Sequence, residues 1–286
     1  MGNLTPELER KLGMAVERMP AFPKSVQKIL ELTRNINCLP KELVAVIEKD
    51  PVMTLKILRV VNSAFYGLPN KVTSVNQAVV YLGINTLKNL ALSFAAVGIL
   101  PGFNAAGFDT QRYLVHSLTT AVLARQLCQK YGQGQADPGD CYIAGLLHDF
   151  GKVVFALFLA PEFSHAMALT EAKDIPLHEA ELEVIGVEHG YVGAMLAAKW
   201  QFAEPLVECI RLHHVMDAEP NAMLDCLRMA DQIARQRGQS IAGTPYRDDE
   251  ATVAPGRFGV DSTAVAASLG DLDKIVAEAM AFVEVQ

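Results

Sequence analysis

Apolar residues recur at intervals of three and four along almost the whole chain, which is the spacing of one helix face. We find no convincing run of alternating apolar and polar residues of the kind that predicts a half-buried strand. Asp50-Pro51 has the form of a helix N-cap followed by proline in the first turn. Ser74 with Gln77 has the form of a capping box, and Gly83 should break the helix that it opens. The pattern predicts an all-α protein.

Interruptions in this spacing predict three parts. Residues 1–108 form an N-terminal helical part, and the glycines and prolines of Pro101–Asp109 mark its expected boundary. Residues 109–237 form a second helical part. Residues 238–286 begin with a segment rich in glycine, proline and polar residues, typical of a surface loop, and then return to helical spacing. This last part should pack back on the body of the protein.

Composition excludes several classes of protein. An apolar fraction of 51% with 20% charged residues is typical of a soluble globular chain. The two helices that meet at Gly83 superficially resemble a helix-turn-helix, but the net charge is −7 and Lys88 is the only basic residue nearby. We therefore expect no nucleic-acid partner, because phosphate binding relies on clustered positive charge. No Walker motif or dinucleotide fingerprint is present, so no organic cofactor is expected.

The cysteines and the apolar runs indicate a compartment. Five cysteines are an odd number and form no C-x-x-C pair, which favours reduced, buried thiols. The N-terminus is charged and lacks the apolar region of a signal peptide. The longest apolar run, Leu90–Leu100, is too short to span a bilayer. We expect a cytoplasmic protein without a membrane partner.

Histidines and aspartates occupy helix positions that would otherwise face an apolar core. Such side chains are costly to bury alone, and imidazole with carboxylate is a ligand mixture that divalent transition metals prefer. A single buried histidine is more often a hydrogen-bonded core residue, as we expect for His165 and His178, and Asp231 could simply pair with Arg235. One metal centre would satisfy the whole set together. The candidate ligands are His116, His148, Asp149, His189, His213, His214 and Asp231.

The order of these residues resembles that of the HD-domain metal-dependent phosphohydrolases. That superfamily has an upstream histidine, then His-Asp at a helix end, then a downstream aspartate, and the likeness implies His116, His148, Asp149 and Asp231 as ligands of a first ion. His189 and the pair His213-His214 resemble the two-metal HD-GYP branch, in which Asp149 would bridge the ions and Lys152 would contact a substrate phosphate. The implied cofactor is one or two divalent transition-metal ions, such as iron, manganese, zinc, nickel or cobalt.

The first part of the chain is similar to HDOD domains. The similarity covers roughly residues 17–235 and rests on Pro20-Ala21-Phe22-Pro23, Asp50-Pro51, Ile57–Tyr66 and Val79–Gly83. It implies an HD-like helical bundle with an N-terminal helical subdomain, and a bacterial regulatory role with a signalling protein as partner. Many HDOD members have lost metal ligands, whereas this chain keeps the full set. Unlike HD-GYP enzymes, it has Val215–Pro220 after the paired histidines in place of a Gly-Tyr-Pro segment.

Two hypotheses of function follow. In the first, the protein is a metal-dependent phosphohydrolase that acts on a phosphoester or nucleotide, with Asp149 and Lys152 as catalytic residues. In the second, it is a non-catalytic signalling module whose metal centre is structural or vestigial, because metal binding can contribute directly to folding. Its first part, including Asn62, Ser63, Phe65 and Tyr66, would then present a surface to a partner.

Overall fold

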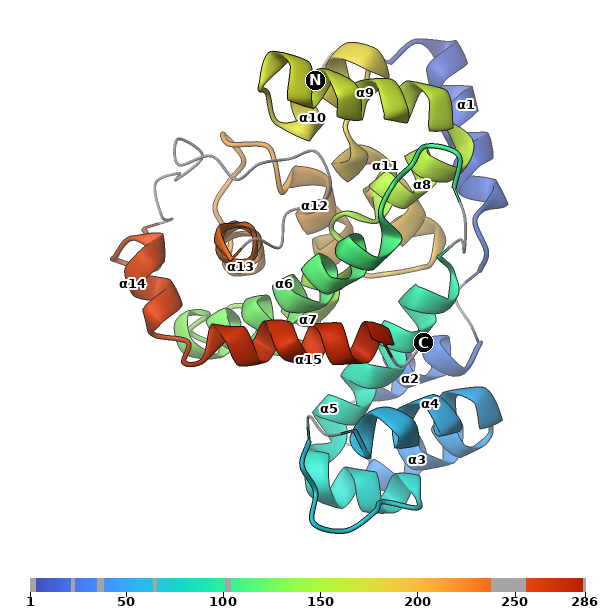
Figure 1. The fold of residues 1–286 in the computed structure, drawn as a ribbon, viewed down its shortest axis with the longest axis vertical. Helices are drawn as coiled ribbons and strands as arrows, with labels where there is room; N and C mark the ends of the chain where they lie inside the picture. Colours follow the sequence, from blue (N-terminus) through green and yellow to red (C-terminus); the bar gives the residue numbers. More distant parts are fainter. Residues whose placement is uncertain are drawn as a thin grey trace. The chain divides into compact units, whose positions relative to one another are not determined.

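The structure is a computed structural model that describes residues 4–21, 24–34, 39–63, 66–100, 104–237 and 256–284. These residues form helices and connecting loops with no strand among them (Figure 1), which confirms the predicted all-α class. Contacts divide the chain into two compact units. Unit 1 contains Met1–Pro20 and Leu100–Leu272, and unit 2 contains Ala21–Ile99 and Asp273–Gln286.

The units differ from the three predicted parts at two places. The chain passes from unit 2 to unit 1 at Leu100, close to the predicted boundary, but the first 20 residues belong to unit 1 and the last helix belongs to unit 2. Sequence spacing shows where a segment is helical and not what its apolar face packs against, so it could not assign these terminal helices. As a division into domains, the three predicted parts stay a prediction.

Unit 1 is built from helices whose starts follow local capping rules. Asp109 and Asp137 accept hydrogen bonds from backbone amides of the first turns of α6 and α7, and Asn221 does the same for α13. The helices of this unit are α1 (Pro6–Arg18), α6 (Thr110–Tyr131), α7 (Pro138–Leu147), α8 (Phe150–Phe158), α9 (Ala160–Lys173), α10 (Leu177–Val184), α11 (His189–Lys199), α12 (Glu204–Leu212), α13 (Ala222–Gln236) and α14 (Ser262–Ala267).

Two glycines allow helices of unit 1 to approach closely. In Figure 1, α6 lies along α7, and a Cβ atom at Gly145 of α7 would come within 2.6 Å of the Ala121 Cα atom of α6. Likewise, a Cβ atom at Gly151 of α8 would come within 2.0 Å of the carbonyl oxygen of His189 in α11. Any larger residue at either position would push the two backbones apart. The approach matters because α6, α8 and α11 all carry predicted site residues.

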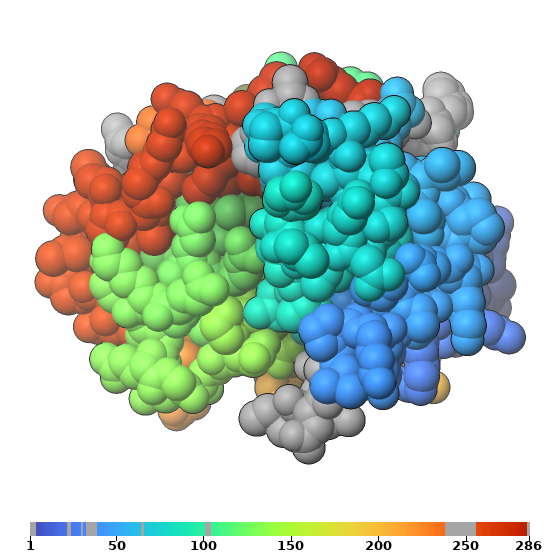
Figure 2. Space-filling view, turned by 90° about the horizontal axis from the view of Figure 1, so that it is seen from below, coloured from blue at the N-terminus to red at the C-terminus, as the bar shows by residue number. Residues whose placement is uncertain are grey.

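Unit 2 has an apolar core around one long, kinked helix. It contains α2 (Lys24–Arg34), α3 (Pro40–Glu48), α4 (Pro51–Val61), α5 (Val75–Gly98) and, from Asp273 on, α15 (Leu272–Glu284). Helices α3 and α4 pack against α5, and the stacked rings of Phe94 and Phe282, 4.5 Å apart, join α15 to it. Figure 2 shows α2–α5, from blue to cyan, as one continuous surface.

The helix caps and the helix break that the sequence predicts in unit 2 are confirmed in part. Asp50 caps α4 by accepting a hydrogen bond from the Met53 amide at 3.0 Å. Ser74 caps α5, but the Gln77 side chain accepts from the Thr73 amide and so does not close the predicted reciprocal box. Gly83 interrupts α5 as a kink with φ 77°.

Phe65, a residue of the expected partner surface, lies outside the described residues, as do Phe22-Pro23 and residues 238–255 of the predicted loop.

Two stretches are long and apolar enough to cross a membrane by length and composition alone, Val75–Gly98 and Pro138–Phe158. Of the most apolar window in each, 56% and 89% are buried within the protein. Gly83 divides the first stretch, and the second contains the His148-Asp149 pair at the junction of α7 and α8. Burial on this scale is typical of core helices of a globular fold.

Candidate metal centre

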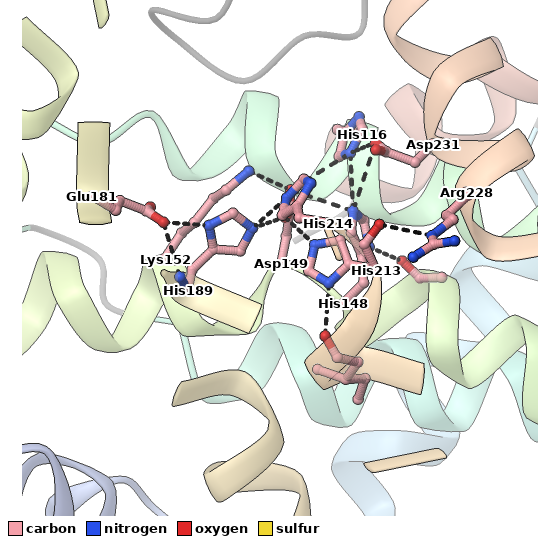
Figure 3. A network of polar contacts seen from close by, with 12 residues as sticks. His116, His148, Asp149, Lys152, Glu181, His189, His213, His214, Arg228 and Asp231 are labelled. Atoms are coloured by element: carbon pink, nitrogen blue, oxygen red, sulfur yellow. Dashed lines mark hydrogen bonds and ion pairs between the residues drawn. The ribbon is translucent and has the colours of Figure 1, made fainter. Parts of the chain in front are cut away.

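All seven predicted ligands come together in unit 1 (Figure 3). His116 lies in the middle of α6, and Asp231 lies on α13, the other helix that packs along α6. The remaining five residues stand at helix ends, where the backbone can direct neighbouring side chains to one point. His148 and Asp149 join α7 to α8, His189 begins α11, and His213 and His214 follow α12.

Asp149 occupies the middle of the cluster, and its two carboxylate oxygens face different groups. Its Oδ2 atom lies 3.6 Å from Nε2 of His116 and 3.4 Å from Nε2 of His148. Its Oδ1 atom lies 3.0 Å from Nε2 of His189 and 3.8 Å from Nε2 of His213. We call the two groups subsite A, formed by Asp149 with His116, His148 and Asp231, and subsite B, formed by Asp149 with His189, His213 and His214.

The distances between donor atoms fit metal ions of ordinary size. In subsite A, the Nε2 atom of His116 lies 3.4 Å from that of His148 and 3.1 Å from Oδ1 of Asp231. In subsite B, the Nε2 atoms of His189 and His214 are 3.1 Å apart. Metal–ligand bonds of about 2.1 Å place neighbouring ligands about 3.0–3.4 Å apart in octahedral and tetrahedral sites. Both groups could therefore hold a metal ion.

Hydrogen bonds at the Nδ1 atoms of His148 and His213 fix the direction in which the Nε2 lone pairs point. The Nδ1 atom of His148 is 2.8 Å from the Gly145 carbonyl oxygen, and that of His213 is 2.7 Å from the Ile210 carbonyl oxygen. Because a carbonyl oxygen only accepts, each Nδ1 carries the proton and each Nε2 presents a lone pair to the cluster. The Nε2 atom of His213 is buried and has no hydrogen-bond partner within the described part of the chain. A cation between Asp149 and His213 would satisfy it.

Electrostatics keeps the two aspartates ionised. Burial favours the neutral acid, but the positive charge of Lys152 and a hydrogen bond from His189 outweigh it and hold the pKa of Asp149 well below its usual range. Asp231 is also buried, and Arg235 and a hydrogen bond from His116 hold the pKa of Asp231 well below its usual range. Arg235 is the i+4 partner that the sequence suggested for Asp231, and the two form an ion pair. Ionised carboxylates are the form that a metal requires.

The histidines of subsite B differ in protonation. Burial lowers the pKa of His213 to about 4, and burial with the neighbouring His213 lowers the pKa of His214 well below its usual range, so both rings are neutral at pH 7. For His189, burial opposes the charged form, but the Glu181 carboxylate outweighs it and the pKa rises to about 9. In the absence of metal, a proton on His189 therefore occupies the position facing Asp149.

A pocket opens beside the two subsites. Its walls include ligands of both subsites and two cationic side chains, Lys152 and Arg235. The Lys152 ammonium lies 2.8 Å from Oδ2 of Asp149. Three residues at the start of α10, Pro176, Leu177 and His178, complete the lining. The pocket thus combines the metal ligands with positive charge suited to an anionic group.

Sequence reasoning missed three residues that support the ligands. His178, which we expected to be a hydrogen-bonded core residue without a role at the site, stacks on His214 with ring centroids 4.1 Å apart. Glu181 accepts a hydrogen bond from His189, and Arg228 of α13 donates to the carbonyl oxygens of Leu212 and His213 at the end of α12. The signal in the sequence is weak, because each residue acts on a partner in another helix. Only the charged residues at buried positions of α10 and α13 could have drawn attention.

Comparison with known proteins shows which family and which solved structures the chain resembles. Residues 19–216 match the model of the HDOD domain family. The structure of an HDOD domain protein of unknown function from Geobacter sulfurreducens is 25% identical, with a TM-score of 0.79 over 98% of this chain and 99% of that one. A protein from Shewanella amazonensis SB2B, provisionally named a phosphohydrolase, is 26% identical, with a TM-score of 0.73 over 96% and 97% of the two chains.

A relative from Treponema pallidum (strain Nichols), described as an uncharacterized protein, is 28% identical over 217 residues. The matched region is 76% of this chain and 41% of that protein, so the match covers less than half of the length of that relative.

Proposed function

This chain belongs to the HDOD domain family, and on that premise we propose that it holds two divalent transition-metal ions and hydrolyses small phosphoesters. One observation carries the proposal: Asp149 is shared by two groups of ligand atoms, His116 and His148 on one side and His189, His213 and His214 on the other. Two-metal hydrolytic sites are built around such shared carboxylates. Iron, manganese, zinc, nickel and cobalt all suit this mixture of imidazole and carboxylate.

Bound divalent ions would polarise a phosphoryl group and lower the pKa of water beside it. The protein's own side chains contribute orientation and charge. Lys152 is only 7% exposed and lines the pocket, so its ammonium can bind a phosphate oxygen under weak solvent screening. Arg235, which also lines the pocket, adds a second cation while it holds Asp231. Pro176 and Leu177 add apolar surface to the lining of the pocket.

The features around the pocket favour a small substrate. The chain lacks the Gly-Tyr-Pro segment that follows the paired histidines in HD-GYP proteins, and Asp217 and Glu219 stand in its place as exposed residues. Neither residue is among those that line the pocket, so their negative charge stands outside it. We propose that a small phosphoester fits this site better than a cyclic dinucleotide.

The test begins with metal analysis of freshly purified protein and continues with a screen of phosphomonoesters and phosphodiesters with each metal. We expect one to two transition ions per chain and metal-dependent hydrolysis of a small phosphoester. Hydrolysis should vanish in His148→Ala and fall strongly in Lys152→Ala, whereas Lys173→Ala, on the exposed end of α9, should leave it unchanged. A protein that stays metal-free after reconstitution with iron, manganese, zinc and nickel would overturn the proposal.

A second candidate function is a regulatory module whose metal centre is structural. The observation that favours it is that the ligands tie α6, α8, α11, α12 and α13 together, so bound metal would stabilise unit 1 whether or not it acts on a substrate. Such a module would work in the cytoplasm of a bacterium through a signalling protein as partner. Bound metal with no turnover of any phosphoester would favour this candidate.

A further inference from the structure

Behind subsite B lies a carboxylate that the ligand set does not include. Glu181 of α10 is 0% exposed, and its Oε2 atom lies 2.6 Å from Nδ1 of His189 (Figure 3). The same oxygen accepts a hydrogen bond from the backbone amide of His189 at 2.8 Å. The opposite nitrogen of the ring, Nε2, faces Oδ1 of Asp149 at 3.0 Å. Glu181, His189 and Asp149 thus form a line that ends in the metal centre.

Burial of the Glu181 carboxylate is energetically unfavourable, so packing alone does not explain its position. Its Oε1 atom is buried and has no hydrogen-bond partner among the residues that the structure describes. Within the same described ranges, no lysine or arginine forms an ion pair with it. A buried carboxylate is strongly disfavoured unless a positive charge balances it, and the charge beside Glu181 is that of the His189 ring when both ring nitrogens carry protons. A divalent ion bound at Nε2, on the far side of the ring, would take the place of that proton and supply the charge.

A second residue of α10 faces the same subsite. His178 precedes Glu181 by three positions, so both lie on one face of the helix. The ring of His178 stacks on that of His214, with an interplanar angle of 11°, while Glu181 holds His189. Helix α10 therefore contacts two of the three histidines of subsite B.

We infer that Glu181 is a positioning residue for subsite B, which fixes the orientation of the His189 ring and strengthens its bond to a metal ion. A carboxylate that accepts the Nδ1 proton leaves the Nε2 lone pair directed at the metal and makes it more basic. The ring cannot turn, because the same oxygen also binds the backbone at residue 189. This inference rests on the proposed metal binding and adds that the two ions are held with different outer support.

The alternative is that Glu181 serves only as a cap for α11. Glu188, the N-cap residue of that helix, makes no side-chain capping bond, and Glu181 accepts the first amide instead. Glu181→Gln separates the two roles, since the amide oxygen of glutamine can still accept both hydrogen bonds but brings no charge. Glu179→Gln, the same change at an exposed position of α10, is the matched control.

The experiment uses the full chain titrated with Mn²⁺, read by bound metal per chain and by electron paramagnetic resonance. Wild type and Glu179→Gln should bind two ions with the spectrum of a magnetically coupled pair. Glu181→Gln should bind Mn²⁺ in subsite B about 10–100-fold more weakly, as is typical for loss of a residue behind a ligand. At limiting Mn²⁺ it should then show the six-line spectrum of an isolated ion.

The outcomes separate this inference from the proposal it rests on. No metal in wild type would overturn the proposed metal centre. A coupled pair in Glu181→Gln, with wild-type affinity, would overturn only the role of Glu181. An unchanged melting temperature of metal-free Glu181→Gln together with unchanged Mn²⁺ affinity would assign Glu181 to capping alone, because glutamine keeps the hydrogen bonds of the cap. Glu181→Asp, which keeps the charge but shortens the reach, should bind more tightly than Glu181→Gln and more weakly than wild type.

Discussion

The two subsites share Asp149 but are built in different ways. Subsite A takes His116 and Asp231 from the interiors of two long helices that pack along each other, and cations stand beside its carboxylates, Arg235 at Asp231 and Lys152 at Asp149. Subsite B adds only histidines, all from helix ends. Its outer support is the buried carboxylate of Glu181 and the Arg228 side chain that caps α12.

The two subsites therefore differ in the charge that they present to a metal ion. In subsite A two carboxylates would face a bound ion, and their own cations offset part of their charge. In subsite B one shared carboxylate would face the ion, and the second carboxylate would act through the His189 ring. An ion in subsite A would therefore be attracted mainly by direct charge, whereas an ion in subsite B would depend on the orientation of neutral rings. Substitutions that remove charge should therefore weaken metal binding more at subsite A, and substitutions that disturb ring orientation should weaken it more at subsite B.

The largest effect is expected from Asp149→Asn, because it removes the only ligand common to both subsites. The amide keeps the shape of the side chain but not the charge that holds two cations close together. We expect at least one ion to be lost and the melting temperature to fall, since bound metal stabilises the native state. Metal analysis and thermal unfolding measure both effects, with the exposed Asp217→Asn as control. Unchanged metal content would show that Asp149 does not bridge two ions.

Gly151→Ala should be the next most severe, and it disturbs the geometry between the subsites without touching a ligand. The new Cβ atom would meet the His189 carbonyl at 2.0 Å, so α8 and α11 must separate. Overpacking of this kind costs about 1–3 kcal/mol of unfolding free energy. Because His189 moves with α11, subsite B should lose more affinity for metal than subsite A. Denaturant unfolding and metal titration test this, and equal loss at both subsites would contradict the comparison.

One ligand from each subsite provides a direct test of their independence. His148→Ala should empty subsite A and His213→Ala should empty subsite B, each with a loss greater than the roughly 10–100-fold typical of outer-shell changes. Anomalous diffraction from crystals of each variant grown with Mn²⁺ would show which position keeps an ion. If either variant lost both ions, the two halves would be one cooperative site.

The smallest effect is expected from Arg235→Gln, which weakens only the outer support of subsite A. Arg235 forms an ion pair with Asp231 on the side away from His116, and glutamine can keep a hydrogen bond but no charge. We expect metal affinity at subsite A to fall about 10-fold and subsite B to be unaffected. Arg237→Gln, exposed at the end of α13, is the matched control, and calorimetric titration with Mn²⁺ measures both. Tighter binding in Arg235→Gln would show that its charge repels the ion more than it orients Asp231.

The sequence by itself determined the helical class and the residues with metal-binding chemistry. The period of the apolar positions is a local property, and so are the caps at Asp50 and Ser74. The seven predicted ligands stood out because a histidine or aspartate on an apolar helix face needs a partner. The structure brings them to one place, while their role as ligands and the role of Lys152 stay predictions for the experiments above.

Only the tertiary structure decided how the seven residues divide and what stands behind them. The split of Asp149 between two groups depends on the close approach of α6 to α7 and of α8 to α11, which sequence spacing does not encode. His178 and Glu181 act on histidines of other segments, so no periodicity along α10 could assign them. The terminal helices likewise joined units that their own sequences could not specify. Local pattern fixes which face of a helix is buried, but the partner of that face is set by packing between segments distant in the chain.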